Sequence, residues 1–427
     1  MTTLPTRYCS THEAIATITS GQRIYVGGGS GVPLPLLEAL AERAGELRDV
    51  EIVHILTAGS DPTAAPALRR SFRHNALFVG PNLRESVQAG RADFTPIFLS
   101  EAPRLFQSGV LPLDVALIQV SPPDDHGFCS LGVEVGCTLP AARAAKTVIA
   151  EINTQMPRTL GDSFLHISHI DTWVETNRPL AETAQGSITE VAAQIGAHIA
   201  DRIPDGATLQ LGIGAIPNAV LRALKNKRHL GIHTELFSDG VIDLVESGVI
   251  DGEAKSIHTG KIVAGFVLGT RRLFDWIDNN AMVELHPTDY VNDPAIIARN
   301  TRMVAINAAI QVDLSGQVCA DSIGSRIYSG AGGQVDFIRG AARAHGGLPI
   351  IALPATARKG AVSRIAPTLT LGAGVVTSRY DVHTIVTEYG VAELHGKTLT
   401  QRAHALIAIA HPRFRDELSW AARKLGL

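Results

Sequence analysis

The sequence predicts an α/β fold of two tandem open, mostly parallel α/β domains that arose by duplication. Three observations support this prediction: a length of 427 residues, short apolar runs that alternate with amphipathic stretches, and a Gly-rich pattern that occurs twice. At roughly 150 residues per domain, the length predicts two or three domains. Hydrophobic residues make up 45% of the chain and charged residues 19%, so a sizeable core can form in each domain.

The internal repeat consists of three segments that occur in the same order in both halves. The matching pairs are residues 21–40 with 206–224, 50–60 with 230–240, and 116–132 with 308–324. With one gap, Gly21 falls on Gly206, and the second pair places His54 on His233 and Leu56 on Glu235. We therefore predict an N-terminal α/β domain over residues 1–185 and a C-terminal one over residues 186–427.

Buried parallel strands are predicted wherever a short, β-branched apolar run is bounded by Gly, Pro or Asp. Helical periodicity lies between these runs, for example over residues 35–49 and 189–203. This alternation is typical of an open α/β layer. The predicted strands are 23–27, 50–56, 76–80, 95–99, 115–120, 147–152, 208–212, 231–237, 262–268, 303–310, 349–355, 374–378 and 383–390.

The charge pattern and the cysteines indicate a cytoplasmic enzyme rather than a nucleic-acid or membrane protein. Lys and Arg total 38 against 41 Asp and Glu, and the chain has no polybasic run. Apolar runs stay below the ~20 residues that cross a bilayer, and residues 1–14 lack the features of a signal peptide. The four cysteines, with no CxxC pair, fit a reducing compartment: Cys9, Cys129, Cys137 and Cys319.

Several common motifs fail when their spacing is tested. The dinucleotide fingerprint lacks its third glycine, because Val32 and Pro217 occupy that position in the two turns. The run from Gly390 to Lys397 has one residue too many for a P-loop. No metal-ligand spacing is present, since His166 and His169 have no obvious third ligand. We therefore expect no metal and no tightly bound cofactor.

Three segments of the second half combine into a candidate site. Residues 211–220 (LGIGAIPNAV) predict a strand, a small-residue turn and a helix whose free N–H groups suit an anion or a thioester carbonyl. Pro217 suits the first helical position. Glu235 lies at the carboxyl end of the next strand, where ligands bind in open sheets. From its reference pKa of about 4.3, Glu235 is expected to be ionised and nucleophilic at neutral pH.

The third segment is the glycine-rich run 328–337 (YSGAGGQVDF). Glycines let the backbone approach a ligand closely and direct N–H groups toward it. Such donors stabilise the oxyanion that forms when a thioester is attacked. A tight βα connection is the simpler explanation for each glycine turn alone, and we prefer it for Gly29 in the first copy.

Together with residues 353–365 and 375–394, these segments resemble the acetyl-CoA hydrolase/transferase family of class I CoA-transferases. Within it, the resemblance is to its 4-hydroxybutyrate and butyryl-CoA:acetate branches. The resemblance implies that Glu235 is the catalytic residue and that an acyl-CoA and a short-chain carboxylate are the substrates. It also implies a homodimer. The residues it implies for CoA binding are Gly212, Ile213, Gly214, Ala215, Ile216, Gly332, Gly333 and Lys359.

The hypothesis is ping-pong transfer of CoA through a glutamyl-CoA thioester on Glu235. Two alternatives stay open: hydrolysis of acyl-CoA by the same glutamate, and a non-catalytic acyl-CoA sensor. The identity of the carboxylate also stays open, with acetate, propionate, butyrate, 4-hydroxybutyrate and a small dicarboxylate as candidates. Candidate acyl contacts are Arg84, Asp124, Asp125, His126 and Arg158, although an exposed charged loop is the simpler interpretation.

Overall fold

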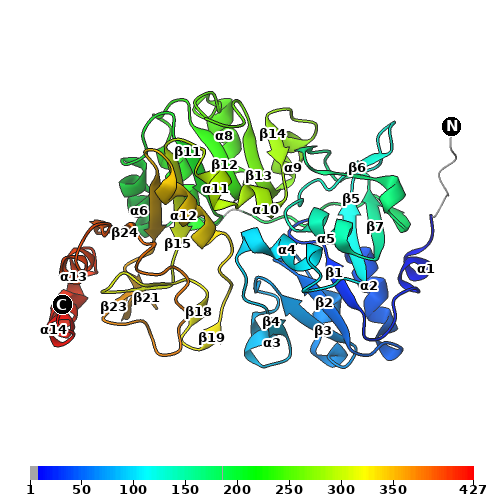
Figure 1. The fold of residues 1–427 in the computed structure, drawn as a ribbon, viewed down its shortest axis with the longest axis horizontal. Coiled ribbons are helices and arrows are strands. Elements are labelled where there is room, and N and C mark those ends of the chain that lie inside the picture. The colour runs from blue at the N-terminus through cyan, green and yellow to red at the C-terminus, as the bar shows by residue number, and fades with distance from the viewer. Residues whose placement is uncertain (1–7, 185) are drawn as a thin grey trace. The chain divides into compact units, whose positions relative to one another are not determined.

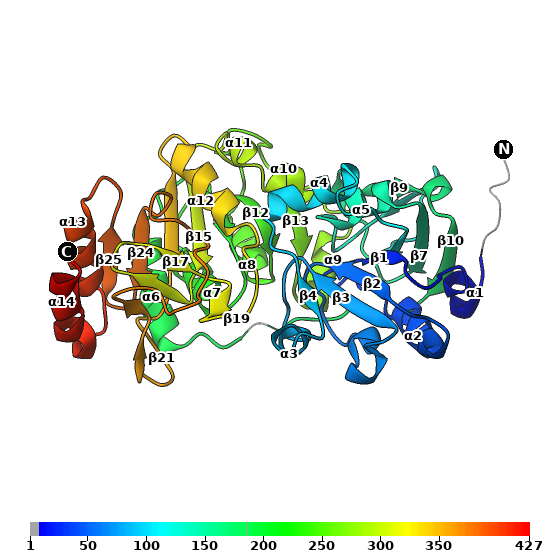
Figure 2. The same ribbon diagram turned by 60° about the horizontal axis from the view of Figure 1, so that its bottom comes forward.

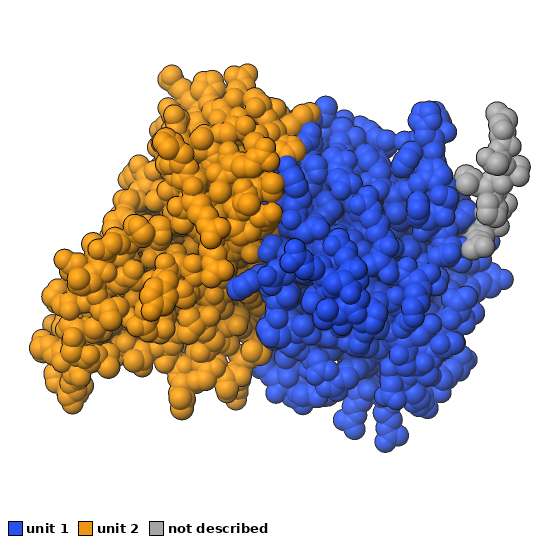
Figure 3. Space-filling view, viewed as in Figure 1, with its two compact units in different colours: residues 1–184, 263–291 blue, residues 185–262, 292–427 orange. Residues whose placement is uncertain are grey.

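The computed structural model describes residues 8–184 and 186–427, and the chain forms two compact units (Figures 1 and 3). Unit 1 comprises residues 1–184 and 263–291, and unit 2 comprises residues 185–262 and 292–427. Residues 263–291 thus pack with unit 1 although they follow Glu235 in sequence. The predicted division after residue 185 falls on a residue outside the described ones and stays a prediction, as does the absence of a signal peptide, which involves residues 1–7.

Unit 1 is built on a seven-stranded sheet in the order β10-β7-β5-β1-β2-β3-β4, and every neighbouring pair is parallel. Its strands are β1 (Arg23–Val26), β2 (Val50–His54), β3 (Phe72–Ala76), β4 (Asp93–Phe94), β5 (Val115–Val120), β7 (Thr147–Asn153) and β10 (Thr172–Thr176). Further strands are β6 (Phe128–Ser130), β8 (Leu160–Gly161), β9 (Phe164–His166), β13 (Ile262–Val267) and β14 (Val283–Leu285). β6 pairs with β9, and β8 with β14.

The helices of unit 1 alternate with its strands along the chain, as is typical of a parallel α/β sheet. The α-helices are α1 (Thr11–Ile15), α2 (Leu34–Glu42), α3 (Arg84–Gln88), α4 (Ala102–Gln107), α5 (Thr138–Ala144), α9 (Arg271–Ile277) and α10 (Thr288–Val291). Short 3₁₀ turns are η1 (Arg43–Gly45), η2 (Pro62–Ala64), η3 (Pro66–Leu68), η4 (Leu99–Glu101) and η5 (Ile167–His169).

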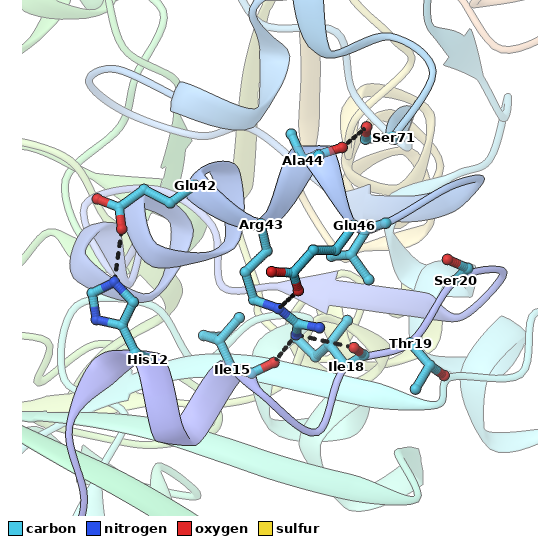
Figure 4. A network of polar contacts seen from close by, with 12 residues as sticks. His12, Ile15, Ile18, Thr19, Ser20, Glu42, Arg43, Ala44, Glu46 and Ser71 are labelled. Atoms are coloured by element: carbon cyan, nitrogen blue, oxygen red, sulfur yellow. Dashed lines mark hydrogen bonds and ion pairs between the residues drawn. The ribbon is translucent and has the colours of Figure 1, made fainter.

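Helices α1 and α2 cover one face of this sheet and are joined by a polar contact at the end of α2. Apolar residues of both helices form one core with strands β1, β2, β5, β7 and β10. The Arg43 guanidinium donates to the carbonyls of Ile15 and Ile18 and pairs with Glu46 (Figure 4). The Ile15 carbonyl also accepts from the Ile18 N–H, so Arg43 adds a side-chain link between the ends of α1 and α2.

Unit 2 contains five parallel strands in the order β24-β20-β15-β11-β12, with β25 antiparallel at the edge (Figures 1 and 2). These strands are β11 (Thr208–Leu211), β12 (Gly231–Phe237), β15 (Met303–Ala308), β20 (Leu348–Ala352), β24 (Thr384–Thr387) and β25 (Gly390–Glu393). Small strands are β16 (Gln311–Asp313), β17 (Val318–Cys319), β18 (Ser322–Ile323), β19 (Arg326–Ile327), β21 (Thr356–Ala357), β22 (Val362–Ser363) and β23 (Ile365–Ala366).

The helices of unit 2 include the two that begin at the predicted glycine segments. They are α6 (Glu190–Ala200), α7 (Ala215–Ala223), α8 (Gly240–Glu246), α11 (Pro294–Ile297), α12 (Gln334–Arg343), α13 (Leu399–Ala408) and α14 (Arg415–Lys424), with the 3₁₀ turn η6 (Pro412–Phe414). Helices α13 and α14 share a core with β16, β20 and β24. None of the described helices combines the length and apolarity that crossing a membrane requires.

The two sheets have the same strand order, which confirms the α/β duplication predicted from sequence. Strands β10-β7-β5-β1-β2 of unit 1 correspond to β24-β20-β15-β11-β12 of unit 2. The register corrects one detail of the alignment. Ile24 pairs with Ile52, and its counterpart Leu209 pairs with Ile232. The position that corresponds to Glu235 is therefore Ile55, not Leu56, and the predicted match of His54 with His233 is wrong by one residue.

Most predicted strands are present, and three are wrong. The strand expected at 76–80 occupies Phe72–Ala76 instead, where His74 and Asn75 are buried within polar contacts. Of residues 95–99, none extends β4, which ends at Phe94. Residues 374–378 form an irregular segment with one isolated bridge at Thr377. Strand β10, with the mixed pattern TWVET, was not predicted because it is an edge strand with few apolar residues.

Candidate active site

Glu235 lies near the carboxyl end of β12, on the strand next to the glycine turn that follows β11. It is half-buried, while the other residues of β12 are buried. In open α/β sheets, ligands bind beyond the carboxyl ends of the strands where the strand order changes direction. That change lies between β11 and β15 in unit 2, one strand away from Glu235.

Two donors contact the Glu235 carboxylate, and neither belongs to β12. The side-chain amide of Asn292 donates to Oε2 at 2.9 Å. The backbone N–H of Gly333 also donates to the carboxylate. Asn292 is fully buried, and its Oδ1 has no hydrogen-bond partner among the described residues. The amide can therefore donate to an ionised Glu235 and, if turned over, accept from a protonated one.

Burial raises the pKa of Glu235 to about 7, and the negative charge of nearby Asp336 acts in the same direction. The hydrogen bonds from Asn292 and Gly333 act in the opposite direction and favour the ionised form. The expectation of full ionisation at neutral pH, taken from the reference pKa, is therefore wrong. A substantial fraction is protonated near pH 7, and the ionised form is more basic than that of an exposed glutamate.

Gly333 leaves no room for a side chain unless Glu235 and Asn292 move. A Cβ at this position would be 2.2 Å from Glu235 Oε2 and 2.3 Å from Asn292 Nδ2. Its φ of −92° is accessible to any residue, so close approach is the constraint here. Gly332, its neighbour, has a φ of +54°, a conformation that favours glycine. Both precede helix α12, and Asp336 lies in the first turn of that helix.

The turn after β11 presents open backbone. Helix α7 begins at Ala215 with Gly214 as its N-cap, and no side chain caps it. An added Cβ at Gly212 or Gly214 would meet no atom within 4 Å. Pro217 is the third helical residue rather than the predicted first, because the helix starts two residues earlier. The exposed N–H groups of this turn can donate to an anionic or carbonyl oxygen of a ligand.

The remaining candidate residues lie in separate places. Lys359 is exposed in the turn between β21 and β22 and has a φ of +56°. In unit 1, Asp124 pairs with Arg158 at 2.9 Å and accepts from the N–H groups of His126 and Phe128. Asp124 and Arg158 therefore have a structural role in this loop: they pair with each other, and Asp124 also stabilises the turn.

Sequence reasoning missed Asn292 and did not assign a role to Asp336. Asn292 lies in a short connection between α10 and α11, with no motif around it, and only the fold brings it to Glu235. Asp336 belongs to the run 328–337, in which the glycines drew attention. The position of Asp336, an acid in an apolar helical pattern that begins directly after two glycines, is the sequence signal that could have identified it; the side chain is buried.

The comparisons with known proteins decide the family. Residues 2–182 match the acetyl-CoA hydrolase/transferase N-terminal domain, and residues 269–422 match the C-terminal domain of that family. The chain belongs to the acetyl-CoA hydrolase/transferase family. The segment 183–268, which contains Glu235 and the turn 212–216, lies between the two matches.

Whole-length relatives cover that segment as well. The chain is 54% identical over 406 residues to a 4-hydroxybutyrate coenzyme A transferase of Clostridium kluyveri, covering 95% of each chain. It is 48% identical to a succinyl-CoA:acetate/propanoyl-CoA:succinate CoA transferase of Fasciola hepatica, covering 96% of this chain and 86% of that one. A crystal structure of a 4-hydroxybutyrate CoA-transferase from Porphyromonas gingivalis is 40% identical, with a TM-score of 0.86 over 98% of each chain.

Proposed function

We propose that this CoA-transferase moves CoA between a short-chain acyl-CoA and a free carboxylate, and that Glu235 carries the CoA as a thioester. The observation that supports this most is the half-buried Glu235 carboxylate, with a raised pKa, held by two N–H donors beside an open glycine turn. In the ionised form it can attack a thioester without an auxiliary base.

In the proposed reaction, a Glu235 oxygen attacks the acyl-CoA carbonyl and expels CoA thiolate, which leaves a mixed anhydride. The thiolate then attacks the Glu235 carbonyl carbon, releasing the first carboxylate and forming glutamyl-CoA. A second carboxylate repeats these steps in reverse and leaves as acyl-CoA. Asn292 donates to Oε2 and Gly333 donates to the carboxylate. Both are therefore placed to stabilise the charge that the glutamyl oxygen acquires when its carbonyl is attacked.

CoA itself is proposed to bind at the turn 212–216, with Gly332 at the acyl end and Lys359 toward an anionic group of the nucleotide. The open backbone of Gly212 and Gly214 supports this assignment. No side chain in this scheme requires a metal or a resident cofactor. The catalytic residues all belong to the proposed C-terminal domain, residues 186–427, and a cytoplasmic homodimer is the proposed state of the protein.

Among carboxylates, 4-hydroxybutyrate is the proposed substrate, with acetyl-CoA or butyryl-CoA as the partner. Two of the similar proteins named above are 4-hydroxybutyrate CoA-transferases. The alternative activity, hydrolysis of acyl-CoA, uses the same glutamate and differs in whether water reaches the intermediate.

The test is to measure acyl-CoA consumption with and without added carboxylates, using acetate, butyrate, 4-hydroxybutyrate and succinate in parallel. We expect turnover to depend on the carboxylate, to show ping-pong kinetics, and to be fastest with 4-hydroxybutyrate. Steady release of free CoA without a carboxylate would show a hydrolase. Ordered ternary-complex kinetics would contradict the covalent route.

A further inference from the structure

The side chain of Thr234 connects the strand of Glu235 to the glycine turn at the point where their backbone pairing ends. Strands β11 and β12 pair through Thr208 with Gly231 and Leu209 with Ile232, and the ladder stops there. The next contact along the two strands is made by the Thr234 hydroxyl. It accepts from the N–H of Leu211 at 3.3 Å.

The same hydroxyl has two acceptors for its single proton. Thr234 Oγ1 lies 3.0 Å from the carbonyl oxygen of Leu211 and 2.9 Å from that of Leu236. Thr234 is 1% exposed, so no solvent replaces these contacts. The buried hydroxyl therefore accepts from the N–H of Leu211 and donates to one of two carbonyls, that of Leu211 before the turn or that of Leu236 after Glu235.

The first copy joins its turn to its second strand in a different way. In the first copy, backbone hydrogen bonds make this connection. The Gly29 N–H donates to the Leu56 carbonyl at 2.6 Å, and the Ala58 N–H donates to the Gly29 carbonyl at 3.0 Å. By the sheet register, the position of Thr234 is occupied by His54, whose ring contacts Ile55 and His74. The hydroxyl link is a feature of the copy that carries Glu235.

From this geometry we infer that Thr234 is a positioning residue, which fixes the Glu235 carboxylate relative to the turn 212–216. The inference rests on the proposed function, in which this turn holds CoA and Glu235 attacks the thioester. The β11–β12 register ends at Ile232, before the strand reaches Glu235. Beyond that point, the Thr234 hydroxyl links the strand of Glu235 to the residue that precedes the turn. A displacement of about 1 Å in such a site lowers the rate about 100-fold.

The experiment compares Thr234→Val and Thr234→Ser with Thr208→Val as a matched control. Thr208 lies on β11, is fully buried, and its hydroxyl has no hydrogen-bond partner among the described residues. The control thus removes a buried hydroxyl from the same strand pair without breaking a link. For each variant we would measure kcat, KM, the dissociation constant of free CoA, the thermal midpoint and the yield of glutamyl-CoA.

We expect Thr234→Val to lower kcat and the rate of glutamyl-CoA formation about 100-fold, with a smaller change in the affinity for CoA. Thr234→Ser keeps the hydroxyl and should stay within about tenfold of the unmodified enzyme. Thr208→Val should not change the kinetics. If Thr234→Val does not fold, Thr234→Ala gives the same comparison with less crowding.

The inference would be overturned if the valine or alanine variant kept the kcat of Thr208→Val, or lost only thermal stability. It would also be overturned if the serine variant were as slow as the valine variant. Glu235→Gln, tested in the same assays, separates the two proposals: activity in that variant would contradict the proposed function, whatever Thr234 does.

Discussion

The two glycine turns have the same place in their sheets and differ in what surrounds them. In the first copy, a Cβ added at Gly27, Gly28 or Gly31 would lie 3.1–3.3 Å from a carbonyl oxygen of Leu56 or of the turn itself. In the second copy, Gly212 and Gly214 have no atom within that reach. Duplication therefore produced two similar turns. Atoms of the protein occupy the space beside the first turn, whereas the space beside Gly212 and Gly214 is open to a ligand.

In each copy, burial raises the pKa of one carboxyl group to about 7: that of the buried Glu134 in unit 1 and that of the half-buried Glu235 in unit 2. Glu134 accepts from the N–H groups of Gly28 and Cys137 and from the Thr138 hydroxyl. These contacts brace the filled turn. Glu235 has two donors and faces the charge of Asp336. The comparison indicates that the same burial serves structure in one copy and chemistry in the other.

The largest effect is expected from removing the Glu235 carboxylate. Glu235→Gln should lower CoA-transferase turnover by at least about 10⁴-fold, because the amide cannot act as the nucleophile. The matched variant in the first copy, Glu134→Gln, should stay within about tenfold of the unmodified enzyme, since its contacts are internal. Steady-state kinetics measure both. Equal losses would show that the two carboxyl groups do not divide their roles in this way.

The second-largest loss of activity is expected for Gly333→Ala. The new Cβ would overlap Glu235 Oε2 and Asn292 Nδ2, so the nucleophile must move and lose its donors. We expect a loss of about 100- to 1,000-fold in kcat, the range for one oxyanion donor. Circular dichroism and the thermal midpoint would verify folding. Normal kcat in a folded Gly333→Ala protein would disprove the close packing at this carboxylate.

The pH dependence of stability tests the role given to Glu134. Its folded-state pKa of about 7, raised by burial, exceeds the unfolded value of about 4.3, so the folded state binds more protons between these values. The free energy of unfolding contributed by this group therefore falls as pH rises from about 4.3 to 7, by up to about 4 kcal/mol. Glu134→Gln should remove this fall.

Urea unfolding of both proteins at several pH values measures this difference. His54, whose pKa is lowered to about 4 by burial and by His74, contributes the opposite slope between about pH 4 and 6.5, and it does so in both proteins. The difference between the two curves therefore isolates Glu134. A difference that stays constant with pH would contradict the raised pKa.

A smaller effect is expected from filling the open turn. Gly212→Ala should leave the thermal midpoint unchanged, since its Cβ meets no atom, and should raise KM for acyl-CoA about tenfold through contact with the ligand. Gly27→Ala, its counterpart, should lower the thermal midpoint because its Cβ lies 3.2 Å from the Gly31 oxygen. If Gly212→Ala left KM unchanged, CoA would not approach this backbone.

The smallest effect concerns Asp336, whose charge raises the pKa of Glu235. Since attack requires the ionised carboxylate, kcat/KM should increase with pH up to about 7 and then level off. Asp336→Asn should move this limb to lower pH, with a change of less than about tenfold at pH 7. A limb that moved to higher pH, or not at all, would show that Asp336 does not act through its charge.

The sequence predicted the duplicated α/β fold because buried parallel strands and glycine turns have strong local signals. It also drew attention to Glu235 as a candidate, because the corresponding position of the first copy carries an apolar side chain; its catalytic role stays a prediction. It could not predict Asn292, because its contact with Glu235 spans 57 residues and depends on the packing of short helices. The raised pKa of Glu235 could not be predicted either, because the burial of Glu235 and its proximity to Asp336 arise only when the chain folds.

A covalent bond between Glu235 and CoA can be trapped directly. The protein would be incubated with acetyl-CoA, treated with borohydride, digested and analysed by mass spectrometry, with Glu235→Gln treated in parallel. We expect reduction of one glutamate to the corresponding alcohol, in the peptide that contains Glu235, and only when acetyl-CoA is present. An unmodified Glu235 in an enzyme that transfers CoA, or a modification at another residue, would contradict it.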